Sequence, residues 1–465
     1  MTLKSKGLHN AQEEEKHWPQ ILATLIVSLA PLSNGIFNSW VSPSIPYMLQ
    51  HKDYHLTEDE AAYFTVIPSI ATMISSVFCY RLLDFIGRKK TMLLIAIPHL
   101  VAWIIIIFDQ HTWTLYIARI MSGVADAAMY CATPAYIGEI TTPTVRGIMG
   151  NSINFMMTLG EFGINLSGHF SDVKTTAYVC IAIPICYVLL LSRMPESPYY
   201  LLKIGKLESA KASLTWLRRK EHTAKDFAKL NSEIQRQVSE TGTWLDLLTK
   251  KSNRRALLIG IFLRFSQQLS GIAIFLSYTQ PIFQKTGNYL SAQLASDIFF
   301  GLFSVISLIG SFTVEKFGRK VSYFYTALFC GIILFLLSIY FFMDQYRFVD
   351  TSPWNWIPLF GMFFFVISFS LGVGVVPTLM LAELFSVKVK AKCLCVLVIV
   401  HGLSSFLTNF IFHQLSMHVR LYCPFLVFSF NCLISAAITL RFLPETKGKT
   451  LETIQQDLKR GLSTF

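Results

Sequence analysis

The segment Arg264–Gly271 reads RFSQQLSG and lies inside a long apolar stretch of the chain. Polar side chains at membrane depth are costly, so they usually face the interior of a helix bundle or a watery cavity. The amides of Gln267 and Gln268 supply paired donors and acceptors, which suit a hydroxyl-rich or otherwise neutral polar solute. They are equally typical of contacts between membrane helices. The segment alone leaves both interpretations open.

The surrounding composition is that of a membrane protein. The chain has 465 residues, of which 53% are hydrophobic and only 15% are charged, and its mean hydropathy is +0.48. These values lie far outside the range of soluble domains. Apolar runs long enough to cross a bilayer predict an all-α protein with twelve transmembrane helices. We place these spans near residues 20–46, 61–82, 91–109, 113–138, 147–170, 176–193, 256–285, 291–315, 321–343, 355–385, 391–416 and 421–443.

The distribution of basic residues predicts how the chain is oriented. Lysines and arginines gather in alternate loops, for example at 88–90, 203–255 and 319–320, whereas the intervening loops hold mostly isolated cations. Because cytoplasmic loops carry such an excess, both termini are expected in the cytoplasm. The protein itself is expected in the plasma membrane. Membrane topology therefore explains the net charge of +12, and the expected partner is the lipid bilayer and no nucleic acid.

The two halves of the chain repeat three motifs in the same order, as expected of a secondary transporter with its site between the halves. The matched positions are Asp84 and Arg88 with Glu315 and Arg319, Glu139 and Arg146 with Glu383 and Lys390, and Glu196 with Glu445.

We expect a cytoplasmic N-terminus at 1–19, a six-helix bundle at 20–195, a cytoplasmic linker with short amphipathic helices at 196–255, a second bundle at 256–445 and a cytoplasmic tail at 446–465.

The repeated acids and cations predict a gate at the cytoplasmic side. Glu139 and Glu383 are expected to pair with nearby cations when that side is closed, and the exchange of these pairs would let one half rock against the other. The alternative is that the cations only anchor helix ends at the interface. The expected gate consists of Asp84, Arg88, Glu139, Arg146, Glu196, Glu315, Arg319, Glu383, Lys390 and Glu445.

Together these motifs resemble the sugar porter family of the major facilitator superfamily. The resemblance rests on the two GRK loops, on R-x3-G from Arg119, on the PES and PET motifs that close the halves, and on QQLSG from Gln267, and it covers 20–455. The WVSP of residues 40–43 is similar to that of insect facilitated trehalose transporters. The resemblance implies two pseudo-symmetric six-helix bundles and alternating access. It also implies a hexose or a disaccharide such as trehalose as cargo.

The resemblance also implies a binding site, at which several positions differ from the family pattern. Gln267 and Gln268 match glutamines expected to bind sugar hydroxyls, while Asn154 stands for a family glutamine that is one methylene longer. Thr378 replaces a tryptophan, and His401 with its neighbour Gly402 replaces an Asn-Trp pair. Two other family asparagines fall at Ala273 and near Phe303. Because loss of polar partners weakens discrimination between sugars, specificity for glucose-like sugars is open.

Charged residues that the family pattern does not predict lie within the spans. Arg264 precedes the glutamines by about one helical turn, Glu161 follows Asn154 on one face, and Asp126 lies in the fourth span. Since each buried charge requires a partner, we predict that Arg264 pairs with Glu161 or Asp126 in or beside the cavity. An interfacial, hydrated position is the alternative.

We predict a facilitative transporter that is a monomer and uses no cofactor or metal. His401 could titrate near neutral pH, but it is more typical of a neutral hydrogen-bonding residue. No acid occurs from Trp18 to Gln50, where the family's proton symporters carry one, which favours uniport. Motifs for ATP or metal-dependent hydrolysis are missing, so no enzyme activity is expected. The alternatives are a transporter-like nutrient sensor, or a carrier of a non-sugar metabolite.

Overall fold

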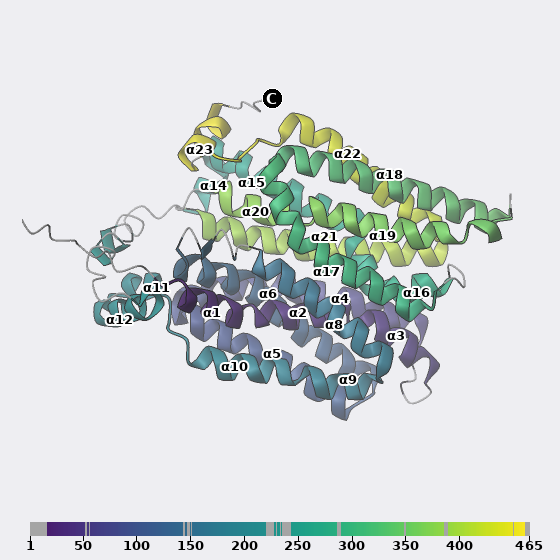
Figure 1. The fold of residues 1–465 in the computed structure, drawn as a ribbon, viewed down its shortest axis with the longest axis horizontal. Coiled ribbons are helices and arrows are strands. Elements are labelled where there is room, and N and C mark those ends of the chain that lie inside the picture. Colours follow the sequence, from purple (N-terminus) through teal and green to yellow (C-terminus); the bar gives the residue numbers. More distant parts are fainter. Residues whose placement is uncertain are drawn as a thin grey trace, which may run out of the picture.

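The computed structural model consists of two bundles of long helices lying side by side (Figure 1). The purple-to-blue helices of the first half form the lower layer of Figure 1, and the green-to-yellow helices of the second half form the upper layer. The structure describes residues 16–51, 54, 56–142, 145–146, 149, 151–219, 227–228, 230–232, 234, 243–285, 290–347, 350–385, 389–449 and 451–460.

The first half contains six spans, of which the first and the last are interrupted. The first span is divided into α1, α2 and α3, and the sixth is divided into α9 and α10. The bounds are α1 Trp18–Val27, α2 Leu29–Ser39, α3 Val41–Gln50, α4 Glu58–Ile86, α5 Arg88–Phe108, α6 Thr112–Ile140, α8 Ser152–Phe170, α9 Val173–Cys180 and α10 Ala182–Ser192.

The second half repeats this arrangement, with breaks in its first and fourth spans. The bounds are α15 Lys251–Gln267, a π-helical turn η2 Gln268–Ile272, α16 Ala273–Lys285, α17 Ala292–Phe317, α18 Arg319–Tyr346, a short 3₁₀ turn η3 Ser352–Trp354, α19 Trp356–Leu371, α20 Val376–Glu383, α21 Lys390–His418 and α22 Tyr422–Phe442. Within the described residues, the twelve spans agree with the predicted ones to within five residues.

Ten helical segments in the described part of the chain are long and apolar enough to cross a membrane. The other two spans, α6 and α8, have 29 and 19 residues and carry the buried polar groups Arg119, Asp126 and Glu161. Polar groups lower the hydropathy of a span while they face the bundle interior, which explains why these two are less apolar. The predicted fold of an all-α membrane protein with two six-helix bundles is confirmed.

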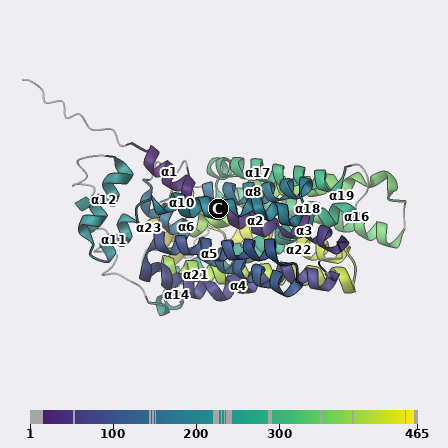
Figure 2. The same ribbon diagram turned by 90° about the horizontal axis from the view of Figure 1, so that it is seen from below.

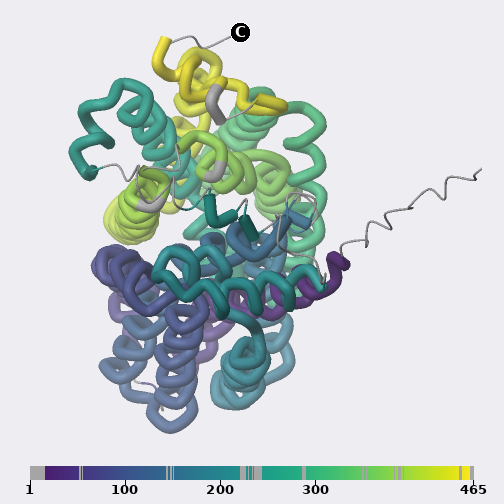
Figure 3. The backbone as a smooth tube through the Cα atoms, turned by 90° about the vertical axis from the view of Figure 1, so that its left-hand side faces the viewer, coloured from purple at the N-terminus to yellow at the C-terminus, as the bar shows by residue number. Residues whose placement is uncertain are grey.

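The two halves meet along two pairs of long helices. α4 packs on α21, and α8 packs on α17. Figure 2 shows these two pairs on opposite sides of the interface, and Figure 3 shows the halves end-on. At the end on the right of Figure 1, α3 of the first half also packs on α16 of the second. A central space between the halves is thus bordered by helices from both.

Short helices lie at the opposite end of the bundles, which we call the linker end (left in Figure 1). They are α11 Pro198–Lys203, α12 Leu207–Arg218, α14 Leu245–Thr249 and α23 Leu451–Arg460. The prediction of an amphipathic helix at 207–217 agrees with α12, whereas half of the residues of the one predicted at 227–238 fall outside the described residues. So do the predicted N-terminal segment up to residue 15 and the end of the tail beyond residue 460.

Candidate functional site

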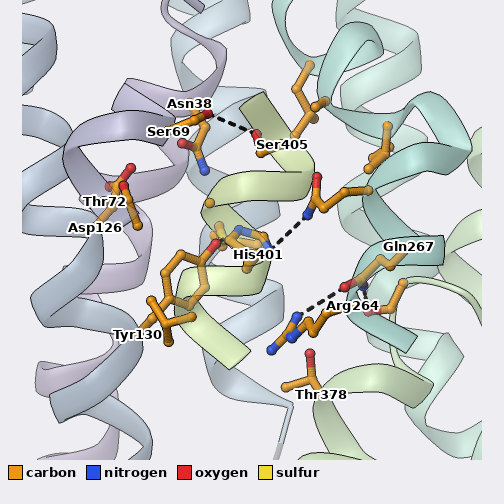
Figure 4. A pocket seen from close by; sticks show the side chains of 18 of the residues that line it. Asn38, Ser69, Thr72, Asp126, Tyr130, Arg264, Gln267, Thr378, His401 and Ser405 are labelled. Atoms are coloured by element: carbon orange, nitrogen blue, oxygen red, sulfur yellow. Dashed lines mark hydrogen bonds between the residues drawn. The ribbon is translucent and has the colours of Figure 1, made fainter. Parts of the chain in front are cut away.

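A cavity of about 210 Å³ lies between the two halves, and helices of both halves line it (Figure 4). Its walls combine apolar side chains with hydroxyls, amides and an imidazole. The polar and charged lining residues include Asn38, Ser69, Thr72, Asp126, Tyr130, Asn154, Glu161, Arg264, Gln267, Gln268, Thr378, His401, Ser405 and Asn409. The cavity therefore brings together all seven side chains that the sequence predicted for substrate binding.

The glutamine segment enters the cavity at a break in its helix. Between α15 and α16 the backbone makes a π-helical turn, and Gly271 has φ 90° and ψ 3°. A residue with a Cβ is disfavoured in this left-handed region, and a Cβ on Gly271 would also lie 2.8 Å from Cδ2 of Phe428. Such π turns are frequent at functional sites because they change the direction in which neighbouring side chains point.

Gln267 makes three hydrogen bonds to the protein itself. Its Nε2 donates to the carbonyl oxygens of Val373 at 3.2 Å and Gly374 at 3.0 Å, and its Oε1 accepts from Nη1 of Arg264 at 3.0 Å. Those two carbonyls lie in the break between α19 and α20, where the helix leaves backbone groups to be satisfied. Gln267 thus holds a broken helix in place, as the helix-contact interpretation of the sequence expected.

Gln268, by contrast, contacts another side chain that lines the cavity. Its Nε2 donates to Nδ1 of His401 at 3.0 Å, and the ring of Tyr130 lies 5.0 Å from the His401 ring. Because Nδ1 accepts this hydrogen bond, the proton of the neutral imidazole is assigned to Nε2. The pair joins the second half's α21 to the helix break, and Tyr130 approaches it from the first half (Figure 4). These three side chains present mixed donors and acceptors to the cavity.

The predicted ion pair of Arg264 is wrong for this conformation. No ion pair between Arg264 and Glu161 or Asp126 occurs among the residues that the structure describes, and Arg264 binds Gln267 instead. Glu161 is completely buried, and neither of its carboxylate oxygens has a partner within the described ranges. Arg119, by contrast, donates to the carbonyls of Phe64 and Phe37 at 2.8 and 2.7 Å and thereby ties α6 to α4 and α2.

The positions at which the chain departs from the family pattern also line the cavity. Asn154 and Thr378 contribute polar side chains, whereas Ala273, Phe303 and Gly402 contribute apolar surface. Several other lining residues were not predicted. Of these, Tyr130 lies one turn after Asp126 and was recognisable from that spacing, whereas Asn38 and the Ser69–Ser405 hydroxyl pair, 3.1 Å apart, depend on how the halves dock.

At the linker end, Arg88, Glu139 and Glu196 of the first half lie in one cluster. Nε of Arg88 donates to Oε1 of Glu139 at 2.9 Å, and the Ser197 hydroxyl donates to the other oxygen of Glu139. The carboxylate of Glu196 accepts from the backbone N–H of Lys89 at 2.9 Å, where α5 begins. A carboxylate at a helix N-terminus is favourable because it satisfies unpaired N–H groups and complements the helix dipole.

The second half builds the same cluster from its own residues. Nη2 of Arg319 donates to Oε1 of Glu383 at 2.8 Å, and the Thr446 hydroxyl donates to Oε2 of Glu383 at 2.5 Å. Glu445 accepts from the backbone N–H groups of Arg319 and Lys320, both at 3.0 Å. Burial raises the pKa of Glu445, but backbone hydrogen bonds from Lys447, Arg319 and Lys320 outweigh it, so that its pKa is lowered.

Each cluster therefore lies within one half, and the Arg88–Glu139 and Arg319–Glu383 pairs do not join the two halves to each other. Asp84 interacts with Arg88 at 3.6 Å and with Lys203 at 2.9 Å. Arg146 binds the carbonyls of Gly138 and Thr141 instead of a carboxylate. Glu315, the counterpart of Asp84, is exposed near the end of α17, and Lys390 begins α21 in a partly buried position.

Comparison with known proteins agrees with this architecture. The family model described as "Sugar (and other) transporter" matches residues 23–458. The chain is 28% identical to a facilitated trehalose transporter of Aedes aegypti over 95% of this chain and 55% of that protein. It is 29% identical to one of Polypedilum vanderplanki, over 95% of this chain and 88% of that protein. The chain thus spans about half the length of the Aedes relative and most of the Polypedilum one.

Among solved structures, a proton:xylose symporter of the major facilitator superfamily, bound to 6-bromo-6-deoxy-D-glucose, superposes with a TM-score of 0.77. The sequence identity is 20%, and the match covers 94% of this chain and 98% of that one. An inward-open form of the xylose transporter from E. coli matches with a TM-score of 0.75 at 20% identity, over 94% and 99% of the two chains. This chain has the major facilitator fold and belongs to the family of sugar (and other) transporters.

Proposed function

We propose that this protein carries a small neutral polar solute, a sugar of hexose or trehalose type, across a membrane by alternating access. The observation that carries the proposal is the cavity between the halves, at which both α15–α16 and α19–α20 are broken. Broken helices at the midplane between two repeats are the usual position of the substrate site in secondary transporters. Membership of the family and the resemblance to trehalose transporters support a sugar as the cargo.

The chemistry of the cavity supports a hydroxylated ligand. Gln268, His401, Tyr130 and Asn154 offer amide, imidazole and phenol groups, which can donate to and accept from sugar hydroxyls. The apolar surface of Phe303 suits the C–H face of a sugar ring. We assign the binding role to Gln268 rather than Gln267, because Gln267 already makes three hydrogen bonds to the protein.

We further propose that the carrier is a uniporter in the plasma membrane, with both termini and the linker end in the cytoplasm. The basic loops gather at that end, which supports the orientation. The region between Trp18 and Gln50 contains no acid for proton coupling. The Arg88–Glu139 and Arg319–Glu383 clusters would keep each half rigid while the halves rock against each other. The chain is expected to act as a monomer, with domains at 20–195 and 256–445 joined by 196–255.

The test is an uptake panel in a transporter-deficient cell, in which surface delivery of the protein is verified. We expect saturable uptake of trehalose or a hexose and a large loss of uptake in Gln268→Ala. Uptake of an organic cation or anion instead would assign the buried Glu161 and Arg264 to cargo recognition and overturn the sugar proposal. No uptake of any compound would favour a sensor. Accumulation driven by a proton gradient would refute uniport.

A further inference from the structure

A second hollow lies on the outer surface of the second half. Ser368 and Leu371 of α19 line it, whereas their neighbours Phe369 and Ser370 line the cavity proposed for the cargo. It is a groove of about 590 Å³ between α17, α18 and α19, which pack against one another. None of its lining residues also lines the central cavity. Its large lining side chains include Phe317, Tyr325, Phe329, Ile333, Phe364 and Leu371.

The groove offers almost no polar surface to an occupant, although several small hydroxyl side chains line it. Thr313 donates to the carbonyl of Ile309 at 3.2 Å, Thr326 to that of Ser322 at 2.7 Å, and Ser368 to that of Thr326 at 3.2 Å. The Ser322 side chain is itself buried. Because these hydroxyls are turned toward backbone oxygens or covered, the wall suits a hydrocarbon and not a polar solute.

The length and the edge of the groove indicate which hydrocarbon fits. Val321 and Ile333 both line it and are twelve residues apart on α18, a distance of about 18 Å at the helical rise. That length is close to one leaflet, about half of the roughly 30 Å hydrocarbon core. At the linker end of the groove, Nζ of Lys316 lies 5.6 Å from the centre of the Phe317 ring, so that a cation borders the groove where lipid phosphates lie.

We propose that this groove binds one acyl chain of an anionic phospholipid from the linker-end leaflet, with the lipid phosphate near Lys316. The other acyl chain stays in the bilayer. An occupied groove supports the break between α19 and α20, since Leu371 lines the groove directly before that break. Thr326, another lining residue, packs directly against Gly372 in that break, because a Cβ on Gly372 would be 2.2 Å from the Thr326 hydroxyl oxygen. The lipid therefore acts behind the helix break whose carbonyls Gln267 binds.

The experiment is photo-crosslinking of the full chain in phosphatidylcholine vesicles that contain a phosphatidylglycerol with a diazirine on one acyl chain. Labelled peptides are mapped by mass spectrometry. We expect label within 317–333 and 364–371. Ile333→Trp fills the groove and should lower this label about tenfold, equivalent to about 1.4 kcal/mol of binding free energy. Ile332→Trp is the matched control, because Ile332 is the adjacent residue on α18, is 43% exposed and does not line the groove.

Lys316→Gln tests the phosphate contact and should reduce labelling by the phosphatidylglycerol probe more than by a phosphatidylcholine probe with the same acyl chain. Equal labelling of the Ile332→Trp and Ile333→Trp variants, or label spread evenly over all lipid-facing helices, would overturn the proposal. So would displacement of the phospholipid probe by a sterol. The readout does not depend on transport, so the groove and the cargo proposal succeed or fail separately.

Discussion

Substitution of each of the two adjacent glutamines in turn distinguishes a structural role of Gln267 from a binding role of Gln268. We compare Gln267→Leu with Gln268→Leu, two identical changes at neighbouring positions. Gln267→Leu removes the hydrogen bonds to Val373 and Gly374 and leaves Arg264 without its partner. Two neutral bonds at about 1 kcal/mol each and one charge-assisted bond at about 1.5–3 kcal/mol give about 4 kcal/mol in total. Hydrogen bonds in membrane bundles average only about 0.6 kcal/mol each, so that three of them would give about 2 kcal/mol. The expected loss of stability therefore lies between about 2 and about 4 kcal/mol.

Gln268→Leu removes one hydrogen bond, to His401, so that it should cost about 1 kcal/mol of stability while it impairs uptake strongly. The assay is the thermal unfolding midpoint of the purified protein in detergent, measured beside uptake in cells. We expect a midpoint several degrees lower for Gln267→Leu and one close to wild type for Gln268→Leu. Equal midpoints, or a more stable Gln267→Leu protein, would refute the division of roles.

Three further predictions concern the helix break and the clusters at the linker end. Gly271→Ala should lower the unfolding midpoint, because the left-handed backbone costs about 1–2 kcal/mol and the new Cβ meets Phe428; a wild-type midpoint would contradict this. Glu383→Gln should cost about 1.5–3 kcal/mol, and Glu139→Gln should cost more, since its side chain is 15% exposed against 27% for Glu383; the reverse order of midpoints would refute the comparison. The stabilisation from Glu445 is fully present above the ordinary carboxyl pKa of 4.5 and is lost as the pH falls through its lowered value. Glu445→Gln should therefore weaken the loss of stability on acidification, and an unchanged pH profile would show that Glu445 does not contribute to it.

Much of the fold was predictable because it follows from patterns that the chain repeats. Apolar length gave the spans, and the matched motifs at Arg88 and Arg319 gave the two halves. The structure adds a physical reason for the motifs: each acid of the PES and PET sequences, Glu196 and Glu445, satisfies backbone N–H groups at the start of a helix. The short helices α11, α14 and α23 were missed, although in α23 Ile454 and Leu458 are spaced one turn apart and are buried.

The partners of the cavity residues were not predictable in the same way. The sequence placed Arg264 and Glu161 in spans, but the direction of Arg264 depends on the π turn after Gln267 and on the break between α19 and α20. These breaks arise from packing between helices far apart in the sequence. For the same reason the sequence treated Gln267 and Gln268 as equivalent, whereas tertiary contacts give them different roles.

The central claim is that the cavity between the halves carries a neutral sugar down its gradient. The most direct measurement is uptake of radiolabelled trehalose and glucose into vesicles reconstituted with the purified protein, with and without an imposed proton gradient. The account predicts saturable uptake that stops at equal concentrations inside and outside, that the proton gradient leaves unchanged, and that Gln268→Ala abolishes. Absence of uptake of either sugar by a folded wild-type protein, or full uptake by Gln268→Ala, would contradict it.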